Sequence, residues 1–407
     1  MKKTLIILLA LLAAVFLTVM ISVSASSSSV TESSEVIKFE KADKNIEGFH
    51  EIKAAEKACG GIIHYSGDKI VYYKDDVSEE LADGVRSLWI EGSDIYYDSG
   101  SVLYTYSLET GETKETAEKP YNILGKYDGN IISYDGRSIY SINETGKTKI
   151  FKDGYYLNSA VLYKNKVYGI PASNVYEYDL DTLKVNKVTD DPEGSSLRMT
   201  DGELYIVTVE KSMGKRNHTY SKMTDEGLKK IFTVKNADMI TGEKPVRDGM
   251  FIETVKSFDD SSDGNMLLYI KDGKMIKADE DYSYYTIGII GSKLCYYKNR
   301  YQYGTYDENL TTFYLYDGKE SKAAFDLDVG SFETVEGYEY DGGLLIEVAY
   351  ELMTRLYKYD GETIEELETP GSFYSIIGLD IIDDKAYIRY SDGEESMQSL
   401  GTVIDLH

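Results

Sequence analysis

Asp-Ile-Tyr-Tyr-Asp-Ser-Gly-Ser-Val-Leu-Tyr-Thr-Tyr-Ser-Leu, residues 94–108, contains the pattern on which the fold prediction rests. Ile95–Asp98 and Val102–Tyr106 are rich in β-branched and aromatic residues, which fit the half-buried surface of a pleated strand. Within Val102–Tyr106 the side chains alternate with a period of two. The turn between the runs contains Gly100, so the stretch predicts two antiparallel strands joined as a hairpin.

The same hairpin pattern recurs along the chain from about residue 60. An aliphatic residue opens one short strand in every unit: Ile63, Ile95, Ile131, Val167, Leu204, Met250, Leu294, Leu344 and Ala386. A tyrosine marks the next strand in all units but the last: Tyr72, Tyr104, Tyr140, Tyr176, Tyr220, Tyr269, Tyr314 and Tyr357, followed by Ile404. The tyrosines recur every 32 to 49 residues, the period of a four-stranded propeller blade.

The unit around residues 88–116 predicts four strands per blade. They are Leu88–Glu91, Asp94–Asp98, Val102–Leu108 and a more polar outer strand at Glu112–Thr116. Seven units look complete, and residues 60–84 and 373–407 form a partial unit at each end. We therefore predict an all-β propeller of about eight four-stranded blades, in which the two partial units merge. Seven blades with an appended hairpin is the alternative.

The N-terminal residues predict export. Lys2 and Lys3 precede a run without charge, Leu5–Val23, and small residues follow at positions 23–25. Residues 1–25 are thus either a cleaved signal peptide or an uncleaved membrane anchor, and both place the rest of the chain outside the cytoplasm. Residues 26–45 predict a Ser-rich linker, and residues 46–407 a single propeller domain that opens with a short helix.

Composition excludes some classes of partner. The chain has 70 acidic and 44 basic residues, a net charge of −26, which disfavours nucleic acid as a partner. Contact with a membrane is expected only through the N-terminal segment. Two cysteines cannot form a disulfide framework. Cys59 and Cys295 either pair with each other or remain separate thiols.

The tyrosine-rich units resemble a known group of proteins. Ile95–Asp98 followed by Leu103–Leu108 is similar to repeats of bacterial exported propellers that resemble the low-density-lipoprotein-receptor-related propeller. Those repeats carry Tyr-Trp-Thr-Asp, whereas this chain has Tyr-Tyr and an Asp in only some units. The resemblance implies a propeller fold and an extracellular setting, and it implies no specific activity. With Trp89 as the single tryptophan, WD-repeat and quinone-dependent propellers are disfavoured.

Departures from the repeat indicate where a ligand would bind. Nine residues separate the aliphatic and tyrosine positions in the first four units, and 16, 19, 20, 13 and 18 in the rest. The inserted residues lie between the second and third strands, so they should form a crescent on one face. The candidate partner-binding residues in two of these segments are Lys211, Lys215, Arg216, His218, Arg300, Tyr301, Tyr303 and Tyr306. The alternative is that the segments are solvated loops without a ligand.

Among metal-binding and catalytic motifs, the sequence contains one candidate, a metal-binding loop. Asp259, Ser261, Asp263 and the following glycine are spaced like the start of a calcium loop, although Ile270 stands where a bidentate Glu is needed. The four histidines do not pair at metal-binding spacing, so no other metal site is predicted. No phosphate-binding glycine loop or serine nucleophile motif appears, and no cofactor is expected.

Two functions remain open. The leading hypothesis is an exported, non-catalytic binding or scaffold module at the cell envelope, whose partner is a protein or a cell-envelope glycan. The alternative is a carbohydrate-active enzyme that uses carboxylates near the propeller axis. That enzyme would have an Asp or Glu whose pKa is perturbed.

Overall fold

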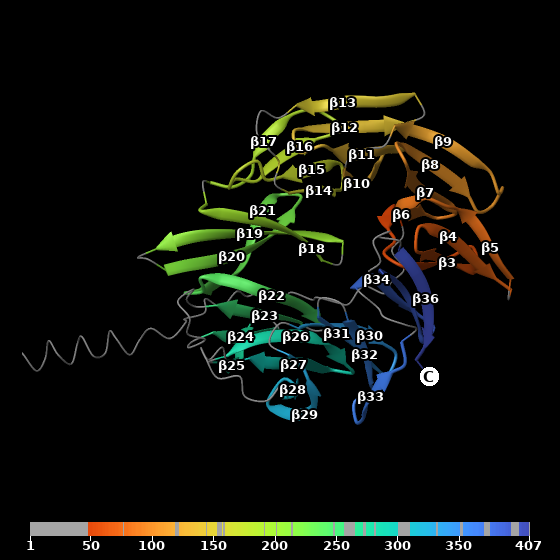
Figure 1. The fold of residues 1–407 in the computed structure, drawn as a ribbon. Coiled ribbons are helices and arrows are strands. Elements are labelled where there is room, and N and C mark those ends of the chain that lie inside the picture. The colour runs from red at the N-terminus through yellow and green to blue at the C-terminus, as the bar shows by residue number, and fades with distance from the viewer. Residues whose placement is uncertain are drawn as a thin grey trace, which may run out of the picture.

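A computed structural model shows a ring of nine β-sheets that follow one another in chain order (Figure 1). It describes residues 48–406, except 76, 119–121, 144, 153–156, 158, 191, 201, 213–214, 247–248, 256–264, 272–273, 281, 300–309, 331–332, 351–352, 370–374 and 392–398. Within this part of the chain there are 36 strands, and we number the sheets as blades one to nine.

The first four blades use short strands. Blade one holds β2 (Ala55–Ala58), β3 (Gly61–Ser66), β4 (Lys69–Lys74) and β5 (Val77–Ala82). Blade two holds β6 (Val85–Glu91), β7 (Asp94–Ser99), β8 (Val102–Ser107) and β9 (Thr113–Glu118), with β1 (His50–Glu51) paired to the inner edge of β6. Blade three holds β10 (Asn122–Tyr127), β11 (Asn130–Tyr134), β12 (Ser138–Asn143) and β13 (Gly146–Lys152). Blade four holds β14 (Ala160–Tyr163), β15 (Lys166–Gly169), β16 (Tyr176–Asp179) and β17 (Val185–Lys187).

The next blades are larger. Blade five holds β18 (Gly194–Thr200), β19 (Glu203–Ser212), β20 (Lys215–Thr224) and β21 (Gly227–Lys235). Blade six holds β22 (Met239–Val246), β23 (Gly249–Val255), β24 (Met266–Lys271) and β25 (Lys274–Glu280). Blade seven holds β26 (Ser283–Ile290), β27 (Lys293–Asn299), β28 (Leu310–Tyr316) and β29 (Ser321–Asp328). Blade eight holds β30 (Thr334–Tyr340), β31 (Gly343–Tyr350), β32 (Met353–Tyr359) and β33 (Ile364–Leu367), and blade nine holds β34 (Ser375–Ile382), β35 (Lys385–Ser391) and β36 (Ser399–Asp405).

The propeller fold is confirmed, but both predicted blade counts are wrong. The two partial units at the chain ends do not merge into one sheet. Residues 55–58, upstream of the recognised repeat, supply the inner strand that completes blade one. Residues 375–405 form a separate three-stranded blade. The helix expected within residues 46–59 is also wrong, because β1 and β2 occupy that region.

Alternation along the strands places the hydrophobic core between blades. All nine positions of the aliphatic column are buried, with at most 4% of the residue exposed. The tyrosine column is less uniform, because Tyr220, Tyr269 and Tyr357 are buried whereas the others are half-buried. Outer strands such as β5 are largely exposed, which agrees with the charged outer edge expected from the sequence.

Glycines on inner strands let neighbouring blades approach closely. A Cβ atom on Gly337 would lie 2.3 Å from the backbone oxygen of Ile287, and one on Gly288 would lie 2.6 Å from Leu344. Corresponding contacts between blades occur at Gly125, against Leu162, and at Gly378, against Lys53. Real Cβ atoms do not approach other atoms so closely, so a side chain at these positions would push two blades apart.

Carboxylates also join successive blades. Glu253 of blade six accepts a hydrogen bond of 2.6 Å from the backbone N–H of Thr286 in blade seven. Glu339 of blade eight accepts one of 3.0 Å from the N–H of Ile289. Each bond satisfies a backbone donor on an inner strand, where an unpaired N–H would be costly.

The ring closes by packing blade nine against blade one without exchanging a strand. Asp380 on β34 accepts hydrogen bonds from the backbone N–H groups of Ala54 (2.8 Å) and Ala55 (3.0 Å). Lys57 forms an ion pair of 2.6 Å with Asp383. These contacts link residues more than 300 positions apart. They hold blade nine against blade one, two blades that no described segment of the chain connects directly.

The structure bears on the two cysteines and, in part, on the membrane segment predicted from the sequence. Cys59 is exposed, Cys295 is buried and both thiols are free, so they do not form a disulfide. Within the residues that the structure describes, no helix has the length and hydropathy needed to cross a membrane. Residues 1–25, for which a signal peptide or anchor is predicted, and the linker at 26–45 lie outside those residues.

Candidate functional site

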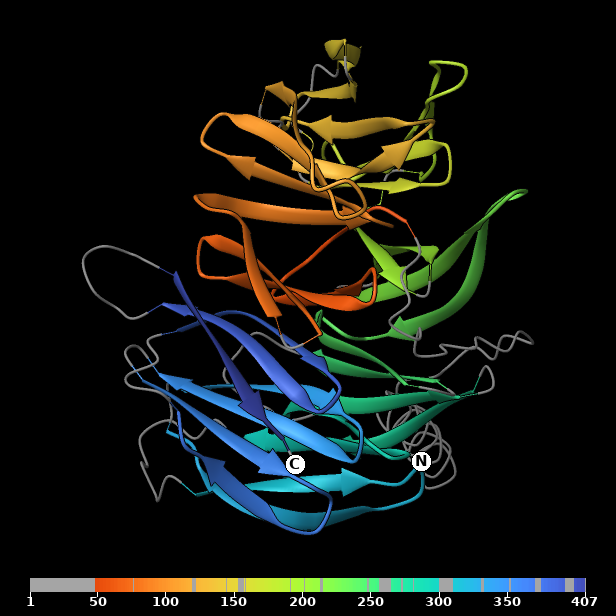
Figure 2. The same cartoon turned by 90° about the vertical axis from the view of Figure 1, so that its right-hand side faces the viewer.

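The predicted crescent corresponds to connections between second and third strands in blades five, six and seven. These connections follow β19, β23 and β27, and they leave the same face because successive turns of an antiparallel sheet alternate between its two ends. In blade five most of the inserted residues form strand instead of loop. The resulting β19–β20 hairpin extends past the neighbouring blades, as the green strands show (Figures 1 and 2).

Three basic residues lie near the tip of this hairpin. Lys211 is directly opposite Arg216 in the strand register, and Lys215 follows at the turn. Lys211 and Lys215 are exposed, and Arg216 is half-buried. Its Nε donates to Glu193 Oε2 at 3.3 Å. Three cations of the predicted basic island therefore gather at the end of a projecting hairpin, with Lys211 and Arg216 on one face of the sheet and Lys215 on the other.

His218 occupies a different environment. Its side chain is buried, with Nε2 2.9 Å from the carbonyl oxygen of Ala237. Burial lowers the pKa of the imidazole, and the nearby Arg216 lowers it further. His218 thus packs inside blade five as a neutral ring, away from the exposed lysines.

The other predicted binding residues lie outside the described part of the chain. Arg300, Tyr301, Tyr303 and Tyr306 fall within residues 300–309, and the candidate calcium residues Asp259, Ser261 and Asp263 fall within 256–264. Only the flanking strands of these connections are described. Among the described residues, no group of three or more His, Cys, Asp or Glu side chains is arranged to hold a metal ion.

A pair of carboxylates lies between blades eight and nine. Glu336 and Glu347 are direct cross-strand neighbours, and the hydroxyl oxygen of Tyr338 lies 3.1 Å from a Glu336 oxygen and 2.9 Å from a Glu347 oxygen, so its single proton is shared between them. Glu347 is buried, and burial raises its pKa to about 7, helped by repulsion from Glu336. This carboxyl group has the perturbed pKa that the enzyme hypothesis predicts, although it lines neither of the clefts described next.

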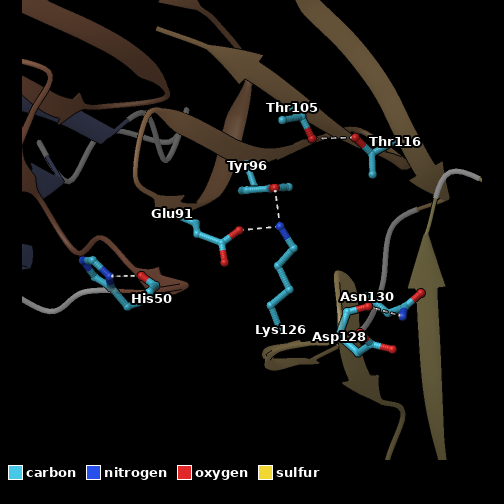
Figure 3. A network of polar contacts seen from close by, with 9 residues as sticks. His50, Glu91, Tyr96, Thr105, Thr116, Lys126, Asp128 and Asn130 are labelled. Carbon is cyan, nitrogen blue, oxygen red and sulfur yellow. Dashed lines mark hydrogen bonds and ion pairs between the residues drawn. The ribbon is translucent and has the colours of Figure 1, made fainter. Parts of the chain in front are cut away.

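A polar cleft of about 350 Å³ opens between blades two and three. Lys126 extends from β10 toward Glu91 and Tyr96, and its Nζ donates to the Glu91 carboxylate and to the Tyr96 hydroxyl at 3.0 Å (Figure 3). Burial lowers the pKa of Lys126, but these two hydrogen bonds outweigh it, so the pKa is raised overall. Thr105 and Thr116 share a hydrogen bond of 2.6 Å along the same cleft. The lysine is already paired, so the network joins two blades and presents no free charge.

A larger cleft, of about 900 Å³, follows the junction between blades nine and one. Tyr73, Val77, Tyr387 and Val403 supply its apolar lining. His64 lies beneath it, with its ring centre 5.2 Å from that of Tyr387. Burial lowers the pKa of His64 to about 4, so its imidazole is neutral at neutral pH. Sequence reasoning missed this cleft because it exists only where the two ends of the chain meet.

Comparison with known proteins gives distant structural similarity only. No protein family model and no curated protein matches the sequence. The chain is similar to the β-propeller domain of the Trilobed protease from Pyrococcus furiosus (TM-score 0.41, 15% identity), covering 89% of this chain and 97% of that one. It is also similar to BamB from Moraxella catarrhalis (TM-score 0.44, 10% identity), covering 93% and 99%.

A third match is to acylaminoacyl peptidase from Pyrococcus horikoshii (TM-score 0.42, 14% identity). It covers 91% of this chain but 53% of that one, so this protein spans about half the length of the peptidase. With identities and TM-scores this low, the three matches assign neither a family nor an activity. The chain is a nine-bladed β-propeller by its own strand topology.

Proposed function

We propose that this protein is an exported, non-catalytic β-propeller that binds a partner protein or a cell-envelope glycan through the crescent of blades five to seven. The observation that supports this most directly is the basic tip of the β19–β20 hairpin. Like charges that face each other across two strands destabilise a sheet, and Lys211 faces Arg216. A chain of net charge −26 that nevertheless gathers cations there has a surface suited to an anionic ligand.

The setting of this proposal is the outer face of the cytoplasmic membrane or the surrounding medium. It rests on the export signal expected in residues 1–25. There the available anionic ligands are acidic segments of other exported proteins and charged polymers of the envelope. Either class would meet the exposed lysines first, and Glu193 already neutralises part of Arg216.

Charge reversal at the hairpin tip tests the proposal. The double variant Lys211→Glu/Lys215→Glu should lose binding to isolated cell envelopes in a co-sedimentation assay. The matched control is Lys229→Glu/Lys230→Glu, which makes the same charge change on the exposed outer strand β21 of the same blade. Equal binding by the two variants, or no sedimentation of the unaltered protein, would contradict the proposal.

The carboxylates of blade eight support a second candidate, a carbohydrate-active enzyme. Glu347, with a pKa of about 7, would supply a proton at neutral pH, and Glu336 is the neighbouring carboxylate. Hydrolysis of a panel of chromogenic glycosides between pH 5 and 8 is the test. Activity that Glu347→Gln abolishes would favour the enzyme, and a panel without turnover would reject it.

A further inference from the structure

Among the residues that the structure describes, blade nine is the one sheet without an outer strand. Eight sheets end in an outer strand (β5, β9, β13, β17, β21, β25, β29 or β33), and no described strand pairs with the outer edge of β36. The backbone of β36 therefore presents an edge at which a further strand can add. We call this fourth position of blade nine, where the structure describes no strand, the outer slot.

The composition of β36 is that of a covered strand. Every other outer strand contains Lys, Asp or Glu within its length, which is how exposed edges are normally protected. β36 reads Ser-Leu-Gly-Thr-Val-Ile-Asp, with Asp405 at its last position as the only charge. Leu400 and Val403 are 39% and 42% exposed. They differ by three positions and so lie on opposite faces of the sheet, where an added strand would flank both.

The directions of the backbone groups follow from one hydrogen bond. The N–H of Leu406 donates to the carbonyl of Asp384 at 2.8 Å, so it points toward β35. N–H groups alternate along an antiparallel strand, and the register pairs Ile404 with Ala386 and Val403 with Tyr387. The N–H groups at positions 404, 402 and 400 thus point inward, and those of Val403 and Gly401 point into the outer slot.

Charge around the outer slot indicates the occupant. The neighbouring outer strands carry exposed carboxylates, Glu79 on β5 and Glu365 and Glu366 on β33, and a fourth, Glu80, that is ion-paired with Lys69 at 2.7 Å. Figure 1 shows β36 between these strands along the rim. Three lysines line the adjoining cleft: Lys57 pairs with Asp383 and Lys74 donates to the carbonyl of Cys59, whereas Lys385 adds a cation beside the acidic strands.

We propose that the outer slot binds an extended, basic segment of a partner protein as the fourth strand of blade nine. Main-chain hydrogen bonds to Gly401 and Val403 hold the segment, and its apolar side chains, which alternate with basic ones and therefore share one face, cover Val403 on the face that lines the cleft. Lysine or arginine side chains on the segment meet the acidic strands β5 and β33. This site is separate from the crescent and does not depend on the proposed function.

The test measures binding of a fluorescein-labelled heptapeptide, Lys-Val-Lys-Val-Thr-Val-Lys, to the full-length protein by fluorescence anisotropy. The variant Val403→Pro removes one N–H that points into the outer slot and leaves the bonds between β35 and β36 intact. It should weaken binding by up to about tenfold, the upper end of the effect of losing one backbone hydrogen bond. Val403→Ala removes the same side chain but keeps the N–H, so it should cause a smaller loss.

Two altered peptides keep the proposal falsifiable even if Val403→Pro fails to fold. A peptide with glutamate in place of its lysines, and one N-methylated at alternate residues, should both fail to bind the unaltered protein. Equal binding by the N-methylated peptide, or no saturable binding of the basic peptide, would overturn the proposal. Binding that appears only after proteolysis removes the residues before 46 would assign the outer slot to this chain's own N-terminal segment, and would also overturn it.

Discussion

The guanidinium of Arg389 lies 3.7 Å from the ring centre of Tyr65, across the junction between the last blade and the first. Its Nε also donates to the carbonyl oxygen of Gly67 at 2.8 Å. Burial lowers the pKa of Arg389, and the partly desolvated cation is held by the ring face and the carbonyl. One side chain from β35 thereby reaches two groups of blade one, at a junction that the described part of the chain does not cross.

Arg389→Ala should destabilise the protein by about 2–4 kcal/mol, because it removes a desolvated cation–π contact and a charged hydrogen bond. Arg389→Lys should recover less than half of this, since an ammonium cannot stack as a planar guanidinium does. Urea unfolding followed by tyrosine fluorescence measures both effects. Arg86→Ala, at an exposed position of β6, is the matched control and should be nearly neutral. A loss in Arg389→Ala no larger than that of the control would refute the role assigned to this junction.

Gly337→Ala should destabilise the protein by about 1–3 kcal/mol or more, the usual cost of forcing extra volume into a packed interior. Its new methyl group would meet Ile287 at 2.3 Å, so blades seven and eight would have to separate. The matched control is Gly194→Ala on the inner strand of blade five, where a Cβ atom would be 4.0 Å from Val209. That change should be neutral or slightly stabilising. Equal melting temperatures for the two variants would show that the close contact at Gly337 can relax.

The inner-strand glycines show what the sequence pattern did and did not reveal. The aliphatic column predicted buried positions correctly in every blade, because burial and alternation along one strand are local properties. The glycine contacts are not local, since Gly337 is needed only because Ile287 of another blade lies against it. The blade count failed for the same reason. The two chain ends pack side by side through contacts between residues far apart in the sequence, such as the hydrogen bond from Ala54 to Asp380.

The candidate sites were predictable to a similar extent. The insertion lengths located the hairpin that carries Lys211 and Lys215, because extra residues lengthen the spacing between the aliphatic and tyrosine positions of a unit. They did not show that His218, in the same segment, turns inward to Ala237. No sequence motif marks blade nine as a blade with three described strands. The scarcity of charged residues at positions 399–405 was the one signal in the sequence.

Only one of the two cysteines should react in the folded protein. Cys59 is exposed, whereas Cys295 is buried and burial raises the pKa of its thiol to about 12. Because the thiolate is the reactive form, Ellman's reagent at pH 8 should modify Cys59 alone. Cys59→Ser should abolish the reaction in native buffer, and Cys295 should become reactive only in denaturant. Reaction of both thiols in native buffer would mean that blade seven opens readily.

Stability should fall as pH rises through the range in which Glu347 loses its proton. The pKa of this carboxyl group is about 7 in the folded protein against an ordinary value of 4.5, mainly because burial disfavours the charged form. Between these values the folded state holds a proton that the unfolded state has released, so the contribution to stability decreases with pH and the loss is complete above pH 7. A difference of this size corresponds to about 3 kcal/mol.

Glu347→Gln isolates this contribution, because glutamine keeps an acceptor for the Tyr338 hydroxyl but carries no charge. The variant and the unaltered protein should have similar stability at pH 4.5, and the variant should be more stable by up to about 3 kcal/mol at pH 8. Urea unfolding at half-unit steps of pH measures the difference directly. Glu365→Gln on the exposed strand β33 removes the same charge from the same blade and should show no such trend. A constant difference between Glu347→Gln and the unaltered protein across this range would mean that Glu347 is ionised in the folded state throughout.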